Sequence, residues 1–196
     1  MKKVIIASKN QGKINEFKEL FKDFNCEVLS LDNVNFADEI VEEGQTFYDN
    51  ALIKAETIYK KYHIPVIADD SGLCVYALNL RPGIYSARYS GKGDLANNQK
   101  LLEEMKDVKD RRAYFEAAIC LYVSDNQYKL YRGVLEGEIG YEIKGDYGFG
   151  YDKVFYLKEY DKYSSEISLE EKNKISHRAK AFFELKKDLD AYFNHK

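Results

Sequence analysis

The first third of the chain alternates between short apolar runs and apolar residues at helical spacing. Residues 4–7, "VIIA", predict a buried strand, and the polar residues 8–13 predict a loop after it. Over residues 13–24, "KINEFKELFKDF", apolar side chains recur every three or four positions, which predicts an amphipathic helix. A second short strand is expected over 27–31, and an acidic, irregular segment over 32–45. This alternation of strand and helix is typical of α/β proteins.

Two acids interrupt an otherwise apolar stretch further along the chain. Residues 65–75, "PVIADDSGLCV", place Asp69 and Asp70 between two apolar runs. We predict a buried strand over 65–68 that ends in an acidic turn, followed by a second apolar run over 73–75. The question is why two carboxylates stand side by side between segments that belong in a core.

The remaining pattern predicts a mixed α/β fold in one chain without repeats or linkers. A helix is expected from Thr46, where T-F-Y-D resembles a capping box, to about Tyr62, followed by a long loop over 79–98 and a helix near 96–106. Two strands are expected within 113–140, joined by a turn at 125–127. The last expected elements are a glycine-rich loop over 145–152, a strand over 154–157, a capping box at 168–171 and a closing helix over 176–193.

The composition narrows the class of protein. Of 196 residues, 45% are hydrophobic and 32% are charged, which favours a packed globule over disorder. The 30 Lys and Arg against 33 Asp and Glu give a net charge of −3, which argues against a dedicated nucleic-acid binder. The three cysteines fit free thiols in a reducing compartment. The apolar run at the N-terminus is too short for a signal peptide or a membrane span, so we expect a cytoplasmic protein.

The loop "SKNQGK", residues 8–13, joins a predicted strand to the start of a helix. Backbone N–H groups and the helix dipole make such a junction a ready phosphate site. Lys9 and Lys13 add positive charge, and Gly12 permits close approach of an anion. The first glycine of a P-loop is missing, and a surface turn rich in lysine remains an equal alternative.

Asp69 and Asp70 lie where open α/β sheets place their ligands, at the carboxyl end of a strand. Two adjacent carboxylates repel each other unless a cation joins them, and oxygen ligands favour Mg²⁺ or Mn²⁺. We therefore favour a metal site over a helix cap or a solvated turn. A further acid is expected from "VEEGQTF", which contains Glu42 and Glu43.

Two later segments carry ligand-binding residue types. "GDYGFGYD", residues 145–152, combines three glycines with aromatic side chains that can stack on a base, although an aromatic turn in the core explains it equally well. "EEKNKISHRAK" places Lys172, His177 and Arg178 near a helix start, where cations oppose the dipole unless an acceptor compensates. His177 alone does not indicate a general base.

With these residues in hand, the chain resembles the inosine/xanthosine triphosphate pyrophosphatase family from residue 4 to about residue 190. Six stretches in the same order carry the resemblance: "IIASKNQGK", "EEGQTFYDNALIKA", "IADDSGL", "PGIYSARYSG", "YGFGYD" and "EEKNKISHRA". The resemblance implies one domain over residues 1–196, in which a long mixed sheet with helices forms two lobes around a nucleotide-binding cleft. It also implies a homodimer and Mg²⁺-dependent hydrolysis of ITP, dITP and XTP to the monophosphate and pyrophosphate.

The resemblance also implies roles for individual residues. Asp70 is implied as the catalytic base that orients or deprotonates a water molecule, and Glu42 and Asp70 as the metal ligands. Lys172 and Arg178 are implied as donors to the 6-oxo group of the base. The full set of implied substrate-binding residues is Ser8, Lys9, Asn10, Gln11, Gly12, Lys13, Ser71, Phe149, Gly150, Tyr151, Asp152, Lys172, His177 and Arg178.

Several positions depart from the family pattern, and other functions stay open. Lys9 stands where Gly or His is frequent, Glu43 where Thr is common, and Lys153 where Pro is frequent; Tyr114 and Glu116 replace common arginines. None of these changes removes a required functional group. The alternatives are a nucleotide pyrophosphatase of broader specificity, a sensor that binds nucleotide without cleaving it and, third, a nucleic-acid-binding protein.

Overall fold

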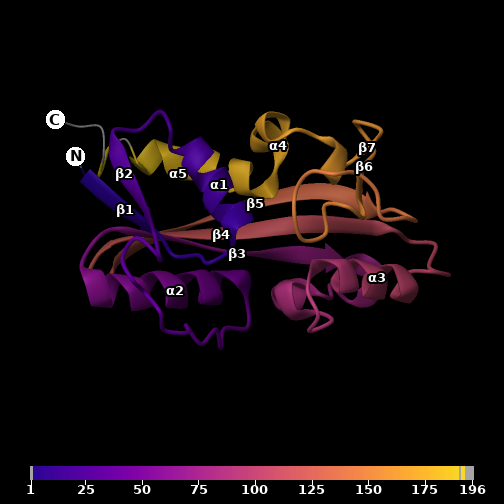
Figure 1. The fold of residues 1–196 in the computed structure, drawn as a ribbon, viewed down its shortest axis with the longest axis horizontal. Helices are drawn as coiled ribbons and strands as arrows, with labels where there is room; N and C mark the ends of the chain where they lie inside the picture. The colour runs from indigo at the N-terminus through magenta and orange to yellow at the C-terminus, as the bar shows by residue number, and fades with distance from the viewer. Residues whose placement is uncertain (1, 190, 193–196) are drawn as a thin grey trace. The chain divides into compact units, whose positions relative to one another are not determined.

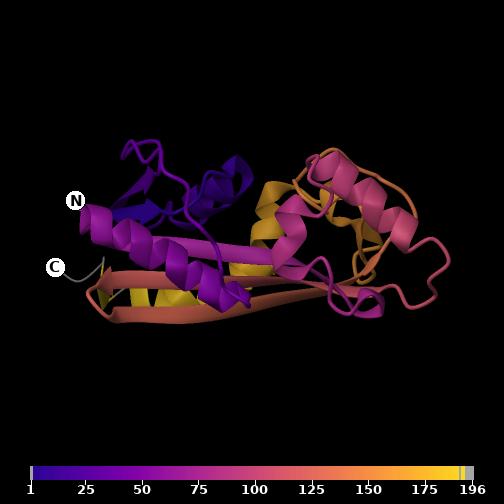
Figure 2. The same ribbon diagram turned by 90° about the horizontal axis from the view of Figure 1, so that it is seen from below.

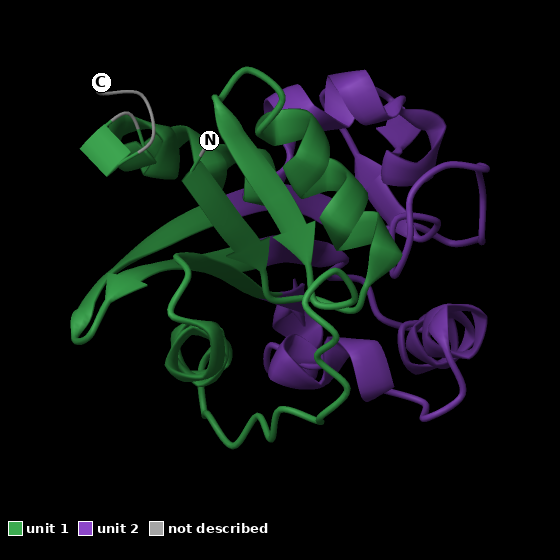
Figure 3. Cartoon of the chain, turned by 60° about the vertical axis from the view of Figure 1, so that its left-hand side comes forward, with its two compact units in different colours: residues 1–70, 117–133, 178–196 green, residues 71–116, 134–177 purple. Residues whose placement is uncertain are grey.

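The computed structural model describes residues 2–189 and 191–192, and the chain divides into two compact units (Figure 3). Unit 1 comprises residues 1–70, 117–133 and 178–196, and unit 2 comprises residues 71–116 and 134–177. Seven strands form a sheet in the order β2-β1-β3-β4-β5-β6-β7. The pairs β1–β2 and β1–β3 are parallel, whereas β5–β6 and β6–β7 are antiparallel. The predicted mixed α/β class is therefore confirmed.

Unit 1 packs helices on both faces of its strands. Its elements are β1 (Lys2–Ile6), α1 (Gln11–Leu20), β2 (Cys26–Ser30), α2 (Phe47–Tyr62), the first half of β3 (Val66–Val75), parts of β4 (Arg112–Ser124) and β5 (Gln127–Ile139), and nearly all of α5 (His177–Leu189). Helices α1 and α5 lie on one side of these strands and α2 on the other (Figures 1 and 2). On the α1 and α5 side, Phe17, Phe21 and Phe182 pack in one core cluster with Ile67. This burial fixes the helices that carry the charged residues described below.

The strand β3 corrects the sequence-based expectation of an acidic turn. It runs without interruption from Val66 to Val75, so Asp69 and Asp70 lie within a strand and not in a turn after one. Both carboxylates are buried, because cations of the flanking helices compensate their charges. Acids with such partners need no solvated turn, which is why the pattern of polar residues misled the prediction.

Unit 2 surrounds the other half of the long strands. Its elements are the 3₁₀ helices η1 (Tyr76–Leu78), η2 (Gly83–Arg88) and η3 (Ser164–Glu166), helices α3 (Asp94–Glu104) and α4 (Leu169–Ile175), and strands β6 (Phe155–Leu157) and β7 (Lys162–Tyr163). Helices α3 and α4 lie on opposite sides of the unit 2 strands (Figure 1). The core cluster includes Leu73, Leu101, Phe115 and Phe155.

Most predicted boundaries hold, and two of them differ. The expected loop over 79–98 contains η2 and the start of α3, and the helix expected over 13–24 ends at Leu20. The capping boxes of α2 and α4, at Thr46 and Ser168, are both formed as predicted. The closing helix expected over 176–193 is observed as α5, and residues 190 and 193 of that prediction lie outside the described residues.

None of the helices in the described part of the chain has both the length and the apolar character needed to cross a bilayer. The cysteines Cys26, Cys74 and Cys120 carry free thiols, as expected.

Candidate active site

The loop after β1 is shaped by its own polar side chains. Ser8 Oγ accepts a hydrogen bond from the Asn10 backbone N–H at 3.1 Å, and Asn10 Oδ1 caps α1 by accepting from the Lys13 N–H, also at 3.1 Å. No acid lies in the first turn of α1, so no side chain there offsets the positive end of the helix dipole. Lys9 and Gln11 are exposed at this turn, and Gly12 is half-buried. The arrangement suits an anion.

Asp69 points toward α1 and α5. Its carboxylate lies 2.7 Å from Lys13 Nζ and accepts hydrogen bonds from Arg178 Nε and Nη2 at 3.2 and 3.3 Å. Arg178 Nη1 also donates to Glu16 of α1. Burial alone would raise the pKa of Asp69, but the charges of Arg178 and Lys13 outweigh it and hold that pKa well below its usual range.

Asp70 points the opposite way, toward α2, because successive side chains of a strand alternate between its faces. Lys54 Nζ donates to Asp70 Oδ1 at 3.1 Å, and Asn50 Nδ2 donates to Oδ2 at 3.2 Å. The same Lys54 ammonium donates to Glu42 Oε2 at 3.1 Å. Burial raises the pKa of Asp70, and this increase outweighs the lowering by Lys54 and Lys13. A buried carboxylate with a raised pKa is a better proton acceptor than an exposed one.

The segment that carries Glu42 is tied to α2 through a glycine. The Gly44 N–H donates to Asn50 Oδ1 at 2.9 Å, and a Cβ at Gly44 would lie 2.5 Å from that oxygen. Thr46 completes the start of α2 with its capping box. Asn50 therefore holds Gly44, two residues after Glu42, through its oxygen and Asp70 through its nitrogen.

In unit 2, the glycine-rich loop is organised around Asp152, which is 3% exposed. Its Oδ2 accepts from Lys172 Nζ at 2.8 Å and from the Phe149 N–H at 2.9 Å, and its Oδ1 accepts from Ser164 Oγ at 2.8 Å. Lys172 Nζ also lies 4.8 Å from the centre of the Phe149 ring, within cation–π range. Gly148 adopts φ +80°, and a Cβ there would lie 2.2 Å from Asp152 Oδ2.

Hydrogen bonds and ring packing hold the end of this loop and the nearby His177. Tyr151 is buried and donates from its hydroxyl to the Ser86 carbonyl at 2.7 Å, so its ring belongs to the core of unit 2. Gly150 is fixed by α3 from both sides: its N–H donates to Asp94 at 2.7 Å and its carbonyl accepts from Asn98 Nδ2 at 3.0 Å. The His177 ring stacks on Phe115, with centroids 4.9 Å apart.

Each unit thus brings together part of the predicted set. In unit 1, ion pairs join Lys13 and Arg178 through Asp69, and a separate set joins Glu42 and Asp70 through Lys54. Unit 2 joins Phe149, Asp152 and Lys172. Ser71 follows Asp70 in β3 and is half-buried.

Sequence reasoning missed three participants, Glu16, Asn50 and Lys54. Asn50 and Lys54 fall on the buried stripe of α2 beside Ala51 and Ala55, and polar residues on an apolar stripe were a usable signal.

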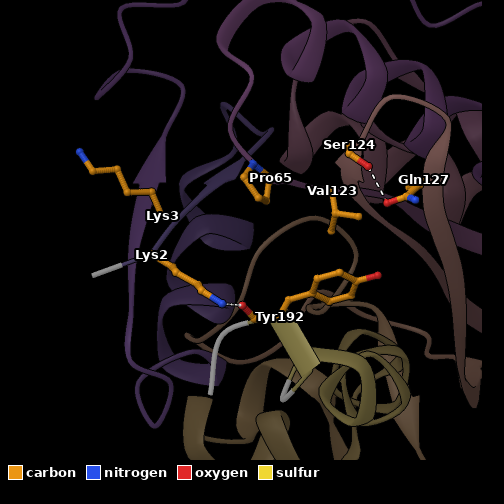
Figure 4. Close-up of a pocket in the computed structure, with 7 residues that line it drawn as sticks. All are labelled: Lys2, Lys3, Pro65, Val123, Ser124, Gln127 and Tyr192. Carbon is orange, nitrogen blue, oxygen red and sulfur yellow. Dashed lines mark hydrogen bonds between the residues drawn. The ribbon is translucent and has the colours of Figure 1, made fainter. Parts of the chain in front are cut away.

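A separate cavity of about 360 Å³ in unit 1 contains none of these residues (Figure 4). It is lined by Lys2, Lys3, Pro65, Val123, Ser124, Gln127 and Tyr192. Lys2 donates to the Tyr192 carbonyl, Lys3 pairs with Glu27 at 3.4 Å, and Ser124 hydrogen-bonds to Gln127. These polar groups already have partners, which makes the cavity a poor candidate for the chemistry.

Comparison with known proteins agrees with the geometry. Residues 4–188 match the model of the Ham1 family. This chain belongs to the Ham1 family. It is 46% identical over 195 residues to the dITP/XTP pyrophosphatase of Bacillus subtilis, covering 97% of this chain and 98% of that one, and 50% identical over 194 residues to that of Bacillus licheniformis, covering 97% and 99%. The resemblance drawn from the sequence motifs is therefore confirmed.

Solved structures of the Ham1 family share the fold. The Staphylococcus aureus Ham1 protein matches with a TM-score of 0.87 at 44% identity, over 97% of this chain and 100% of that chain. A nucleoside-triphosphatase, or dITP/XTP pyrophosphatase, of Mycobacterium abscessus matches with a TM-score of 0.76 at 37% identity, over 93% and 98%.

Proposed function

We propose that this Ham1-family chain is a pyrophosphatase that hydrolyses deaminated purine nucleoside triphosphates, namely ITP, dITP and XTP, to the monophosphate and pyrophosphate. The observation that carries the proposal is the buried carboxylate of Asp70, with its raised pKa, held in place by Lys54 and Asn50. The names of the Bacillus relatives support the choice of substrate. Such an enzyme removes from the nucleotide pool those triphosphates whose deaminated bases would otherwise be misincorporated.

The residues of unit 1 fit Mg²⁺ as the cofactor. Glu42 and Asp70 both lie 3.1 Å from one ammonium group, so their oxygens are already arranged around a positive charge. Within residues 2–189 and 191–192, no group of three or more His, Cys, Asp or Glu side chains is arranged to hold a metal ion. Mg²⁺ is often held by one or two carboxylates together with substrate phosphates and water, and Glu42 and Asp70 would supply the two carboxylates. When bound, Mg²⁺ would neutralise phosphate charge and stabilise the leaving pyrophosphate.

The remaining chemistry belongs to the side chains of this chain. In the proposed step, Asp70 takes a proton from a water molecule while the water oxygen bonds to the α-phosphorus. The bond from that phosphorus to the oxygen bridging to the β-phosphate breaks, and pyrophosphate leaves with the electron pair. Lys54 and Asn50 hold the two oxygens of Asp70 in the orientation for this transfer. Residues Ser8 to Lys13, with the start of α1, hold the triphosphate charge.

Unit 2 supplies the base-binding groups in this proposal. Phe149 offers a ring for stacking, and Lys172 offers a cationic donor to a 6-oxo group, with His177 and Ser71 as further nucleotide contacts. An adenine 6-amino group would present a donor to Lys172 where a 6-oxo group presents an acceptor, which would select against ATP. We further propose that the enzyme is a cytoplasmic homodimer, as the family resemblance implies; light scattering in line with size-exclusion chromatography tests the dimer.

The deciding experiment measures pyrophosphate release from ITP, XTP, dITP, GTP and ATP, with Mg²⁺ and with EDTA. We expect metal-dependent cleavage of ITP, XTP and dITP, with ATP and GTP spared. Tight ITP binding without pyrophosphate release would instead identify a sensor. Cleavage that persists in EDTA would overturn the role given to Mg²⁺.

The metal ligands have a readout that does not need turnover. Thermal unfolding of wild-type protein should shift to higher temperature with Mg²⁺ and substrate analogue, because a ligand that binds only the folded state stabilises it. Glu42→Gln should reduce this shift, whereas Glu43→Gln should leave it unchanged. A reduced shift in Glu43→Gln alone would move the metal ligand to Glu43.

A further inference from the structure

Two side chains of α3 hold one residue of the glycine-rich loop. Asp94 Oδ2 accepts a hydrogen bond from the Gly150 N–H at 2.7 Å, and Asn98 Nδ2 donates to the Gly150 carbonyl at 3.0 Å. Asp94 and Asn98 stand four positions apart in α3, which places them on the same face of the helix. Both polar groups of the Gly150 backbone are therefore bound by one helix of unit 2.

Gly150 lies between the residues of this loop that the proposed function places near the base. Phe149 precedes it with the ring proposed for stacking, and Asp152 follows it and accepts from Lys172 Nζ at 2.8 Å. Glycine has the greatest backbone freedom of any residue, so Gly150, with φ +61°, does not fix the direction of the loop by itself. The two bonds from α3 supply that restraint.

Asn98 stands where an amide does not favour the stability of the fold. Its side chain is 2% exposed, and its Oδ1 is buried with no hydrogen-bond partner among the described residues. A buried acceptor without a partner lowers stability, and most buried polar groups are satisfied. The adjacent Asn97 is satisfied on both sides: its Oδ1 accepts from the N–H and hydroxyl of Ser90, and its Nδ2 donates to the carbonyls of Ser86 and Ala87. By contrast, the amide nitrogen of Asn98 goes to the glycine-rich loop, which indicates a role in placing that loop.

We propose that Asp94 and Asn98 are positioning residues, which hold Gly150 and so place the glycine-rich loop against the base of the nucleotide. This inference rests on the proposed function, which gives that loop the base, and it adds α3 to the elements that determine affinity for the substrate. The effect of both residues should therefore appear in the binding of the base and not in the chemical step at Asp70.

The test compares two probes that each carry one part of the substrate. Inosine monophosphate, the expected product, carries the base without the pyrophosphate, and inorganic tripolyphosphate carries no base. Calorimetry gives the affinity of each protein for both probes, and steady-state kinetics gives kcat and KM for ITP. Asn98→Leu keeps a branched side chain but has no donor. It should weaken inosine monophosphate binding and raise KM for ITP by about 2–10-fold, the usual effect of one lost hydrogen bond, and leave kcat and tripolyphosphate affinity unchanged.

Asp94 can be tested with a conservative variant that restores the contact. Asp94→Ala removes the acceptor of the Gly150 N–H and should weaken inosine monophosphate binding by about 2–10-fold. Asp94→Asn keeps an oxygen at that position and should bind like wild type. In the double variant Asp94→Ala/Asn98→Leu, the loss of affinity should exceed the product of the two single losses, because either bond alone still restrains Gly150.

Two control variants change α3 or its contacts at a distance from Gly150. Gln99→Ala alters an exposed side chain of the helix, and Tyr89→Phe removes the hydroxyl that donates to Glu104 at the end of α3. Both should bind inosine monophosphate like wild type. Urea unfolding adds a further distinction: Asn98→Leu also removes the buried Oδ1, so its free energy of unfolding should stay near the wild-type value while its affinity for the base falls.

The outcomes separate positioning from stability and from the proposed function. Unchanged inosine monophosphate affinity in folded Asn98→Leu and Asp94→Ala proteins would overturn the inference. Equal losses of affinity for inosine monophosphate and tripolyphosphate would also overturn it, because they would mean a general loss of structure and not a displaced loop. If wild type bound inosine monophosphate but released no pyrophosphate from ITP, the proposed function would fail, while the same affinities would still test the role of α3.

Discussion

The two clusters hold buried acids in different ways. In unit 1, Asp69 and Asp70 stand on a strand, and their cations come from helices packed on either face. In unit 2, Asp152 ends a glycine-rich loop and is bound to Lys172, to a hydroxyl and to the backbone N–H of the loop itself. Strand-borne acids keep fixed positions, as proton transfer requires. A loop-borne acid instead sets the shape of the loop, as recognition of a flat ligand requires.

The largest effect should separate the two neighbouring acids of unit 1. Asp70→Asn keeps the size of the side chain but removes the proton acceptor, so kcat for ITP should fall by about 10²–10⁴-fold with little change in KM. Asp69→Asn should instead raise KM, because Lys13 loses its anchor. Steady-state kinetics on both variants checks this, and near-wild-type turnover by Asp70→Asn would remove its assignment as the base.

The same two variants should rank in the opposite order when the loss of folding stability is compared. Asp69→Asn leaves Arg178 and Lys13 without their shared carboxylate and should lower the free energy of unfolding by about 3–5 kcal/mol. Asp70→Asn removes a carboxylate whose charged form burial disfavours, and should change stability far less. Urea unfolding at pH 7 measures both. Equal losses would mean that the two acids share one network.

The pH dependence of stability follows from the directions of these pKa values. The lowered pKa of Asp69 stabilises the fold above its ordinary value of 3.8, and this contribution is lost as the pH falls below that value toward the folded pKa. The raised pKa of Asp70 has the opposite sign, because the folded state takes up the proton first as the pH falls. As the pH falls from 5 to about 2, the free energy of unfolding should therefore decrease more steeply for wild type than for Asp69→Asn. An identical slope in both proteins would contradict the Asp69 assignment.

In unit 2, Asp152→Asn should affect binding more than turnover. It leaves Lys172 without its carboxylate and loosens the Phe149 loop, so KM for ITP should rise by about 10–100-fold while kcat changes little. Asp146→Asn, a change at an exposed acid of the same loop, is the matched control. A fall in kcat with unchanged KM would place Asp152 in the chemistry and remove the contrast between the units.

The smallest effects concern two glycines of that loop. Gly150→Ala has open space for a Cβ but a φ of +61°, which should cost about 1–2 kcal/mol of stability. Gly148→Ala shares the positive φ and would also press on Asp152, so it should cost more and raise KM for ITP as well. Urea unfolding and ITP kinetics compare the two. Equal effects would show that the loop does not depend on Asp152 for its shape.

The features that could be predicted from the sequence are those set by local periodicity and by motifs. The paired strands around residues 125–127, the capped helix α2 and the family were all predicted, because they depend on local spacing and on motifs in a fixed order. The continuous β3 was not, because its acids look like a turn until Lys13, Lys54 and Arg178 are brought beside them. Glu16 lies 162 positions before Arg178, and no local pattern reveals such a pair.

Because side chains alternate along β3, the two neighbouring acids lie on opposite faces of the strand. Asp69 serves the side of α1 and α5 and Asp70 the side of α2, so the doubled aspartate is two separate sites that share a peptide bond. Insertion or deletion of one residue in β3 before position 69 would shift the strand by one position and turn each carboxylate to the opposite face, even though the Asp-Asp dipeptide is kept. For this protein, the spacing of a sequence is thus as much a part of the active site as the letters that fill it.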